Sequence, residues 1–119
     1  MMKTYLFILR KPAHSGAYVQ EILDIILTTA AFDQKVSLLL LDDGVFHLKK
    51  NQQPESVGMK DTAAIFKALT LYDVNDIYVE EDSMQERGLQ VSDLDLSVNT
   101  LKRKQVAGLL KRFDVVLAA

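Results

Sequence analysis

The chain has 119 residues, of which 49% are hydrophobic and 25% charged, so its length and composition predict one globular domain over residues 1–119. This composition excludes a disordered tail, a collagen-like fibre and a polar linker, and the net charge of −2 gives no overall attraction to nucleic acid. The chain contains no cysteine, which excludes disulfides, thiolate metal sites and a thiol nucleophile.

The first half of the chain predicts two buried strands with one helix between them. Residues 5–9 form a continuous apolar run of strand length, as in a strand covered on both faces. After a loop over 12–16, apolar residues recur at helical spacing and predict a helix over about 17–32. Residues 36–41 form a second buried strand, closed by the turn residues Asp42, Asp43 and Gly44.

The second half is less regular but continues the alternation. Residues 45–58 predict a short helix or an open loop, and a helix begins at residue 60 or 61 and ends near 73. A strand over 77–79 is followed by helical turns over 83–87 that stop at Gly88. We expect a fourth strand over 94–98, a last helix capped by Thr100, and a terminal strand over 114–118.

Apolar strands that alternate with amphipathic helices predict an α/β fold. We expect three α/β/α layers around a mostly parallel, five-stranded sheet, with the strand order left open. No uninterrupted apolar run, 38–41 included, approaches the roughly 20 residues of a membrane-spanning helix. Arg10, Lys11 and Pro12 end the first apolar run too early for a signal peptide, so we expect a cytoplasmic protein with no membrane contact.

Ligand sites of parallel sheets gather at the carboxyl ends of the strands, which here are followed by residues 10–15, 42–47 and 80–83. His14 and His47 both lie in these segments, and His47 with Asp42 and Asp43 is a conceivable metal-binding set. We favour a surface turn with a solvated histidine, and a plain loop around His14. Glycine-rich phosphate motifs and a nucleophile elbow are absent, so no metal or cofactor is expected.

Charge is segregated along the chain. Residues 73–95 include eight acidic side chains and one basic, whereas 101–112 include five basic side chains and no acidic one. The basic helix is either a nucleic-acid contact or a solvated outer face. We favour the solvated face, because no aromatic residues are interleaved for base stacking.

Four segments, in this order and at this spacing, resemble the TusC-like branch of the DsrE/DsrF-like sulfur-relay family nearly end to end. They are Asp42 with Gly44-Val45-Phe46, the helix end 66–73, Glu86-Arg87-Gly88-Leu89, and the closing 113–117. The resemblance implies a heterohexamer with TusB-like and TusD-like subunits, two copies of each. It further implies that the complex passes persulfide sulfur to a TusE-like acceptor, for 2-thiolation of the wobble uridine in tRNA, and that this chain meets tRNA only indirectly.

The resemblance also places Glu80 near the position of the acceptor cysteine in the TusD-like subunit. A carboxylate cannot carry a persulfide, and the chain has no thiol, so we expect a non-catalytic accessory subunit. Loops grouped at the carboxyl end of the sheet are expected to pack against sister subunits. The interface candidates are Asp42, Asp43, Gly44, Phe46, Tyr72 and Glu80.

Two questions stay open. Phe46 is either an exposed anchor at that interface or folds back over its own core. The chain is alternatively a stand-alone DsrE-like homo-oligomer that binds a small ligand or anion among its strand-end loops.

Overall fold

A parallel sheet organises the computed structural model, which describes residues 3–11, 18–32, 34–49, 69–74, 76–94 and 97–118. Within these ranges the strands are β1 (Thr4–Leu9), β2 (Lys35–Leu40), β3 (Asp76–Glu80), β4 (Asn99–Leu101) and β5 (Val115–Ala118). All pair in parallel, in the order β4-β3-β2-β1-β5. The predicted α/β fold with a five-stranded sheet is confirmed.

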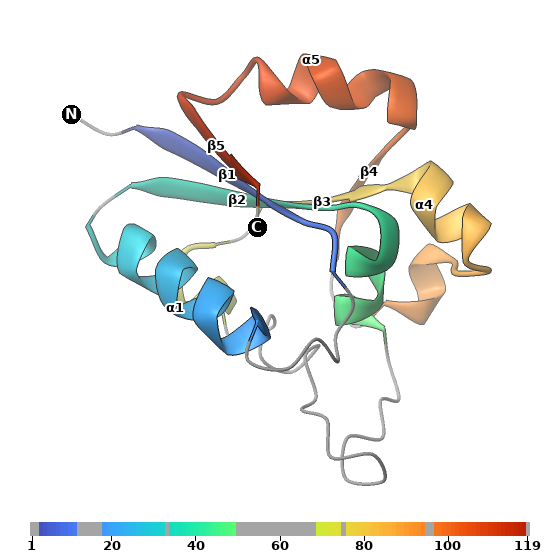
Figure 1. Cartoon of the computed structure of the whole chain (residues 1–119), viewed down its shortest axis with the longest axis horizontal. Coiled ribbons are helices and arrows are strands. Elements are labelled where there is room, and N and C mark those ends of the chain that lie inside the picture. Colours follow the sequence, from blue (N-terminus) through green and yellow to red (C-terminus); the bar gives the residue numbers. More distant parts are fainter. Residues whose placement is uncertain are drawn as a thin grey trace, which may run out of the picture.

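Helices cover both faces of this sheet (Figure 1). The α-helices are α1 (Tyr18–Ala31), α4 (Glu81–Glu86) and α5 (Val106–Leu110). Short 3₁₀ helices are η1 (Asp42–Leu48), η2 (Leu69–Tyr72), η3 (Val91–Asp93) and η4 (Arg103–Gln105). Helix α1 lies on one face and α5 on the other, which gives the three expected layers (Figure 1).

Alternation along the strands divides the core between the two faces. In β1, Phe7 and Leu9 pack in the cluster that includes α1, whereas Leu6 and Ile8 pack in the cluster that includes α5. Successive strand side chains point to opposite faces, so a strand covered on both sides is apolar throughout. The predicted apolar face of α1 is confirmed, because Ile22, Leu23 and Ile26 are buried on the first face of the sheet.

The prediction of the fourth strand was wrong. Residues Asn99–Leu101, not 94–98, pair with Tyr78–Glu80. Leu94 is buried by packing in the core, and its backbone makes an isolated antiparallel bridge with Lys49. Its apolar character therefore reflects burial after η3 rather than a place in the sheet.

The expected cap of the last helix was also wrong. Thr100 lies inside β4, paired with Val79. The turn that leads into α5 is closed instead by the Gln105 side chain, whose Oε1 accepts a hydrogen bond from the Lys102 backbone N–H at 2.8 Å. The apolar spacing of the helix itself was right, since Leu109 is buried against the sheet.

Several sequence predictions fall on residues outside the described ranges. These are the loop over 12–16, the stretch after Lys49, and the helix from residue 60 as far as residue 68. Of the described helices, none has the length and apolar character needed to cross a membrane.

Candidate functional site

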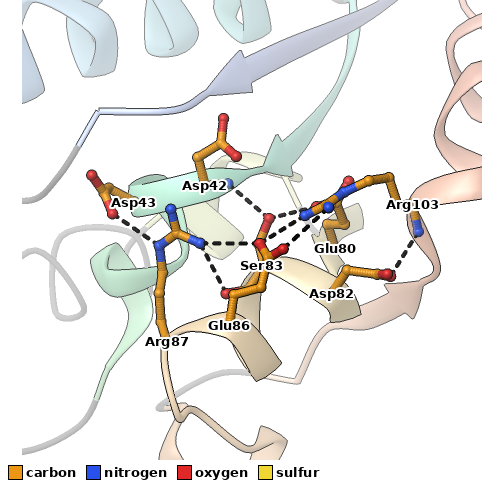
Figure 2. Close-up of polar contacts among 8 residues, drawn as sticks. All are labelled: Asp42, Asp43, Glu80, Asp82, Ser83, Glu86, Arg87 and Arg103. Carbon is orange, nitrogen blue, oxygen red and sulfur yellow. Dashed lines mark hydrogen bonds and ion pairs between the residues drawn. The ribbon is translucent and has the colours of Figure 1, made fainter.

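Strands β2 and β3 end side by side, and the segments that follow them contact each other at the carboxyl end of the sheet (Figure 2). The backbone N–H of Asp42 donates to Ser83 Oγ at 2.9 Å, and Ser83 Oγ donates to Glu80 Oε1 at 2.5 Å. Ser83 is fully buried and Glu80 is 4% exposed. A serine hydroxyl that accepts one hydrogen bond and donates another thus joins the two strand ends.

The buried Glu80 carboxylate is matched by a cation from the edge of the sheet. Arg103 Nε and Nη2 donate to Glu80 Oε1 at 3.1 and 3.0 Å (Figure 2). Arg103 follows β4, which lies beside β3, so strand pairing delivers the guanidinium to the carboxylate. A buried carboxylate is tolerated when it is paired and hydrogen-bonded in this way.

Arg103 also binds the acidic residues of α4. Its Nη2 and Nη1 donate to the two Glu86 carboxylate oxygens at 2.8 and 3.2 Å, and its backbone N–H donates to Asp82 Oδ1 at 2.9 Å. The hydrogen bond from Arg103 lowers the pKa of Glu86, and the bonds to Glu86 and then Glu80 raise the pKa of Arg103. The acidic and basic segments, separate in the sequence, are therefore joined in space.

Arg87 makes a second link between the two strand-end segments. Its Nε donates to Asp43 Oδ1 at 2.9 Å, and its Nη1 donates to the Ser83 carbonyl oxygen at 3.2 Å. Helix α4 ends there, and Gly88 follows at φ = 69°, a left-handed conformation that glycine adopts without strain. The predicted stop at Gly88 is confirmed.

The structure spreads the predicted site residues over different environments. Asp42 and Asp43 are exposed, Phe46 is partly buried against the core on the α1 side, and Glu80 is buried. Gly44 is buried too, and a Cβ atom there would lie 2.0 Å from the Leu9 carbonyl oxygen. The need for glycine at position 44 thus comes from packing within the chain.

Tyr72 does not lie with the other candidates. It is in η2, which precedes β3, and is therefore at the amino end of the sheet, opposite Glu80. Its expected place among the carboxyl-end loops was wrong, because a residue just before a parallel strand lies at the amino end of that strand. Tyr72 is 57% exposed.

The expectation of a solvated His47 was wrong. The side chain is fully buried, and its Nε2 lies 2.9 Å from the Lys11 carbonyl oxygen. A carbonyl oxygen only accepts, so Nε2 carries the proton and donates. Burial lowers the pKa of His47 to about 4. His14 lies outside the described residues, and in the part of the chain that is described no group of three or more metal-ligating side chains forms.

Sequence reasoning missed the roles of Ser83 and Arg103. Ser83 stood at the border of a flagged segment, but its hydroxyl geometry was not foreseeable. The sequence offered one indication of the role of Arg103: an acidic segment, 73–95, followed by a basic segment, 101–112. This charge pattern identifies the partners of Arg103 only once β3 is known to pair with β4.

Comparisons with known proteins agree with this architecture. The DsrE/DsrF-like family matches residues 3–119. The protein TusC homolog of Pseudomonas aeruginosa is 40% identical over 117 residues, covering 98% of each chain. The intracellular sulfur oxidation protein DsrF of Allochromatium vinosum is 39% identical over 94 residues, which are 79% of this chain and 69% of that protein.

A solved structure supports the fold independently. The ychN protein of E. coli superimposes with a TM-score of 0.79 over the whole of both chains at 16% sequence identity. The family match and the 40% identity to the TusC homolog both extend over nearly the whole chain. The chain belongs to the DsrE/DsrF-like family.

Proposed function

We propose that this chain is a non-catalytic accessory subunit of a sulfurtransferase complex. Two observations together carry the proposal. The chain is 40% identical to a TusC homolog over 117 residues, and none of its 119 residues is cysteine. Sulfur relay as a persulfide requires a thiolate that attacks, accepts and then releases the sulfur. This chain supplies no such group, so the covalent step takes place on another subunit.

The carboxyl end of β3 supports the same division of labour. Glu80 stands at the approximate position where the resemblance places the acceptor cysteine of the TusD-like subunit. Its carboxylate is held by Ser83 and Arg103 at hydrogen-bond distance and is almost fully buried. A group held in this way stabilises the fold and is not presented to a sulfur donor.

In the proposed complex, TusB-like and TusD-like subunits complete a heterohexamer. Persulfide sulfur passes from the TusD-like cysteine to a TusE-like acceptor and then to the enzyme that 2-thiolates the wobble uridine of tRNA. The contact surface of this chain centres on Tyr72, which is 57% exposed at the amino end of the sheet. Asp42 and Asp43 are also exposed but lie at the opposite end, where Asp43 is bound to Arg87.

Co-expression tests the proposal. The chain, tagged and expressed with TusB-like and TusD-like partners, is expected to co-purify with both at a fixed ratio. Incubation with a radiolabelled persulfide donor should then label the TusD-like subunit and leave this chain unlabelled after separation under non-reducing conditions. A chain that stays monomeric in the presence of both partners, or that binds sulfur covalently, would contradict the proposal.

A matched variant separates a scaffold role from a chemical one. Replacing the TusD-like acceptor cysteine by serine should abolish labelling of the complex without changing its composition. Glu80→Gln in this chain should leave labelling of the TusD-like cysteine within about twofold, because the carboxylate takes no part in the covalent step.

A further inference from the structure

The outer layer formed by η4 and α5 carries cations at both of its ends. Lys102 and Lys104 come just before α5, Lys111 and Arg112 come just after it, and all four are exposed. We call these four residues the basic patch. Gly108 lies between the two pairs, and the space above it is open, since no atom lies within 4 Å of where its Cβ would be.

Acidic neighbours do not neutralise the basic patch. The Arg103 side chain binds the carboxylates of Glu86 and Glu80, and its backbone N–H donates a hydrogen bond to Asp82. Asp114 accepts hydrogen bonds from the backbone and hydroxyl of Thr4. Lys35, Arg87 and Arg103 form ion pairs, and among the described residues no ion pair involves the patch.

The patch is therefore an island of positive charge on an acidic chain. The formal net charge is −2, so removing four positive charges leaves −6 for the remainder. A cluster of like charge on a chain of negative net charge attracts a polyanion to the face that carries the cluster. It orients such a partner on the η4–α5 layer.

The composition of the patch indicates the kind of partner. Protein interfaces are depleted in lysine and enriched in aromatic side chains, whereas this patch contains three lysines, one arginine and no aromatic residue. Phosphate backbones are bound by exposed Lys and Arg without reading of the bases. Lys104 and Lys111 are seven residues apart, about 10 Å along a helix at ~1.5 Å per residue. That distance spans roughly three phosphates of one strand at ~3.4 Å each.

We propose that the basic patch binds the phosphate backbone of a nucleic acid, independently of base sequence. This inference goes beyond the accessory role proposed above and does not depend on it. Binding is a property of the single chain, whereas the accessory role is measured by assembly with other subunits.

Salt-dependent binding tests the inference. Fluorescence anisotropy of a labelled RNA hairpin, titrated with the purified chain at several salt concentrations, should give a slope of log K against log[salt] near −3. That value follows from about four phosphate contacts at roughly −0.7 to −0.9 each. A DNA hairpin and a second RNA sequence should bind within about threefold, because the bases are not read.

Two matched variants carry equal charge changes at different places. Lys102→Gln, Lys104→Gln, Lys111→Gln and Arg112→Gln together should weaken binding at least about tenfold and bring the salt slope near zero. The control replaces four exposed cations elsewhere by glutamine: Lys3, Arg10, Lys35 and Lys49. It should keep most of the affinity and the slope.

Three outcomes would overturn the inference. RNA binding by the patch variant with wild-type affinity excludes the patch as the binding site. Equal losses of affinity in both variants show that only net charge matters. A patch variant that binds RNA normally but no longer co-purifies with TusB-like and TusD-like subunits assigns the patch to a protein partner. Circular dichroism of both variants verifies the fold, which exposed substitutions should leave intact.

Discussion

The two ends of the sheet differ in how their side chains are used. At the carboxyl end, charged groups such as Glu80, Arg103 and Arg87 are bound to one another within the chain. At the amino end, Phe32, Leu71 and Tyr72 are 71%, 82% and 57% exposed. Parallel sheets generally place their ligand sites at the carboxyl end. Here the polar groups of that end stabilise the fold, and large apolar side chains stay accessible at the opposite end.

The two ends of the sheet thus differ in their roles: the carboxyl end stabilises the fold, and the amino end is available for contacts with other molecules. A closed polar network tolerates few changes, because each partner removed leaves a buried group behind. An exposed apolar side chain adds little to the stability of the single chain, so it is free to serve contacts with other molecules. Substitutions at the carboxyl end should therefore affect folding, and substitutions at the amino end should affect assembly.

The largest effect is expected from Gly44→Ala. The new methyl group would lie 2.0 Å from the Leu9 carbonyl oxygen, so β1 or η1 must move, at a cost of about 3 kcal/mol in unfolding free energy. Gly108→Ala is the matched control, because its Cβ meets open space in a helix and should stabilise by about 0.5–1 kcal/mol. Urea denaturation measures both. Equal effects at the two glycines would show that the carboxyl end is not tightly packed.

The ion pair at the end of β3 should give the next effect. Arg103→Leu leaves the buried Glu80 carboxylate without its cation, so the urea midpoint should fall. Glu80→Gln combined with Arg103→Leu removes the charge as well, and should recover roughly half of that loss. A double variant whose loss equals the sum of the losses of Arg103→Leu and Glu80→Gln alone would mean that the pair does not act as a unit.

His47 makes the carboxyl end sensitive to acid. Its pKa is about 4 in the folded chain and 6.5 when exposed, so between these values the unfolded chain binds a proton that the folded chain does not. Stability should fall as the pH drops from 6.5 toward 4, by up to about 3 kcal/mol from this group, and the group contributes no pH dependence above 6.5. The measurement is the unfolding free energy against pH for wild type and His47→Gln. Parallel curves would contradict the buried, neutral histidine.

Sequence patterns correctly predicted the buried strands and helix α1. They failed where the position of an element depends on which strands pair. The strands around Phe7 and Leu38 and the stripe of α1 follow from local periodicity, because burial on two faces or on one leaves a distinct pattern. Leu94 has the same apolar character for a different reason, and only the register of β3 with Asn99 excludes it from the sheet.

The candidate site was harder to predict than the fold. Glu80 was singled out, but Arg103 lies 23 residues further along and reaches it only because β4 pairs with β3. Burial of His47 depends on how η1 turns against the segment after β1, which leaves no periodic signal. Tertiary pairing, rather than local propensity, therefore determines which polar groups meet.

The smallest effect on stability is expected at the amino end, from Tyr72→Ser. The side chain is 57% exposed, so the unfolding free energy should change by no more than about 0.5 kcal/mol. Exposed aromatic side chains are enriched at protein interfaces, so the same change should reduce retention of the TusB-like or TusD-like subunit in co-purification. Asp43→Asn, which weakens the contact with Arg87 at the other end, is the comparison. If Asp43→Asn lowers retention and Tyr72→Ser does not, the partners bind at the carboxyl end, and the separation of tasks between the two ends is wrong.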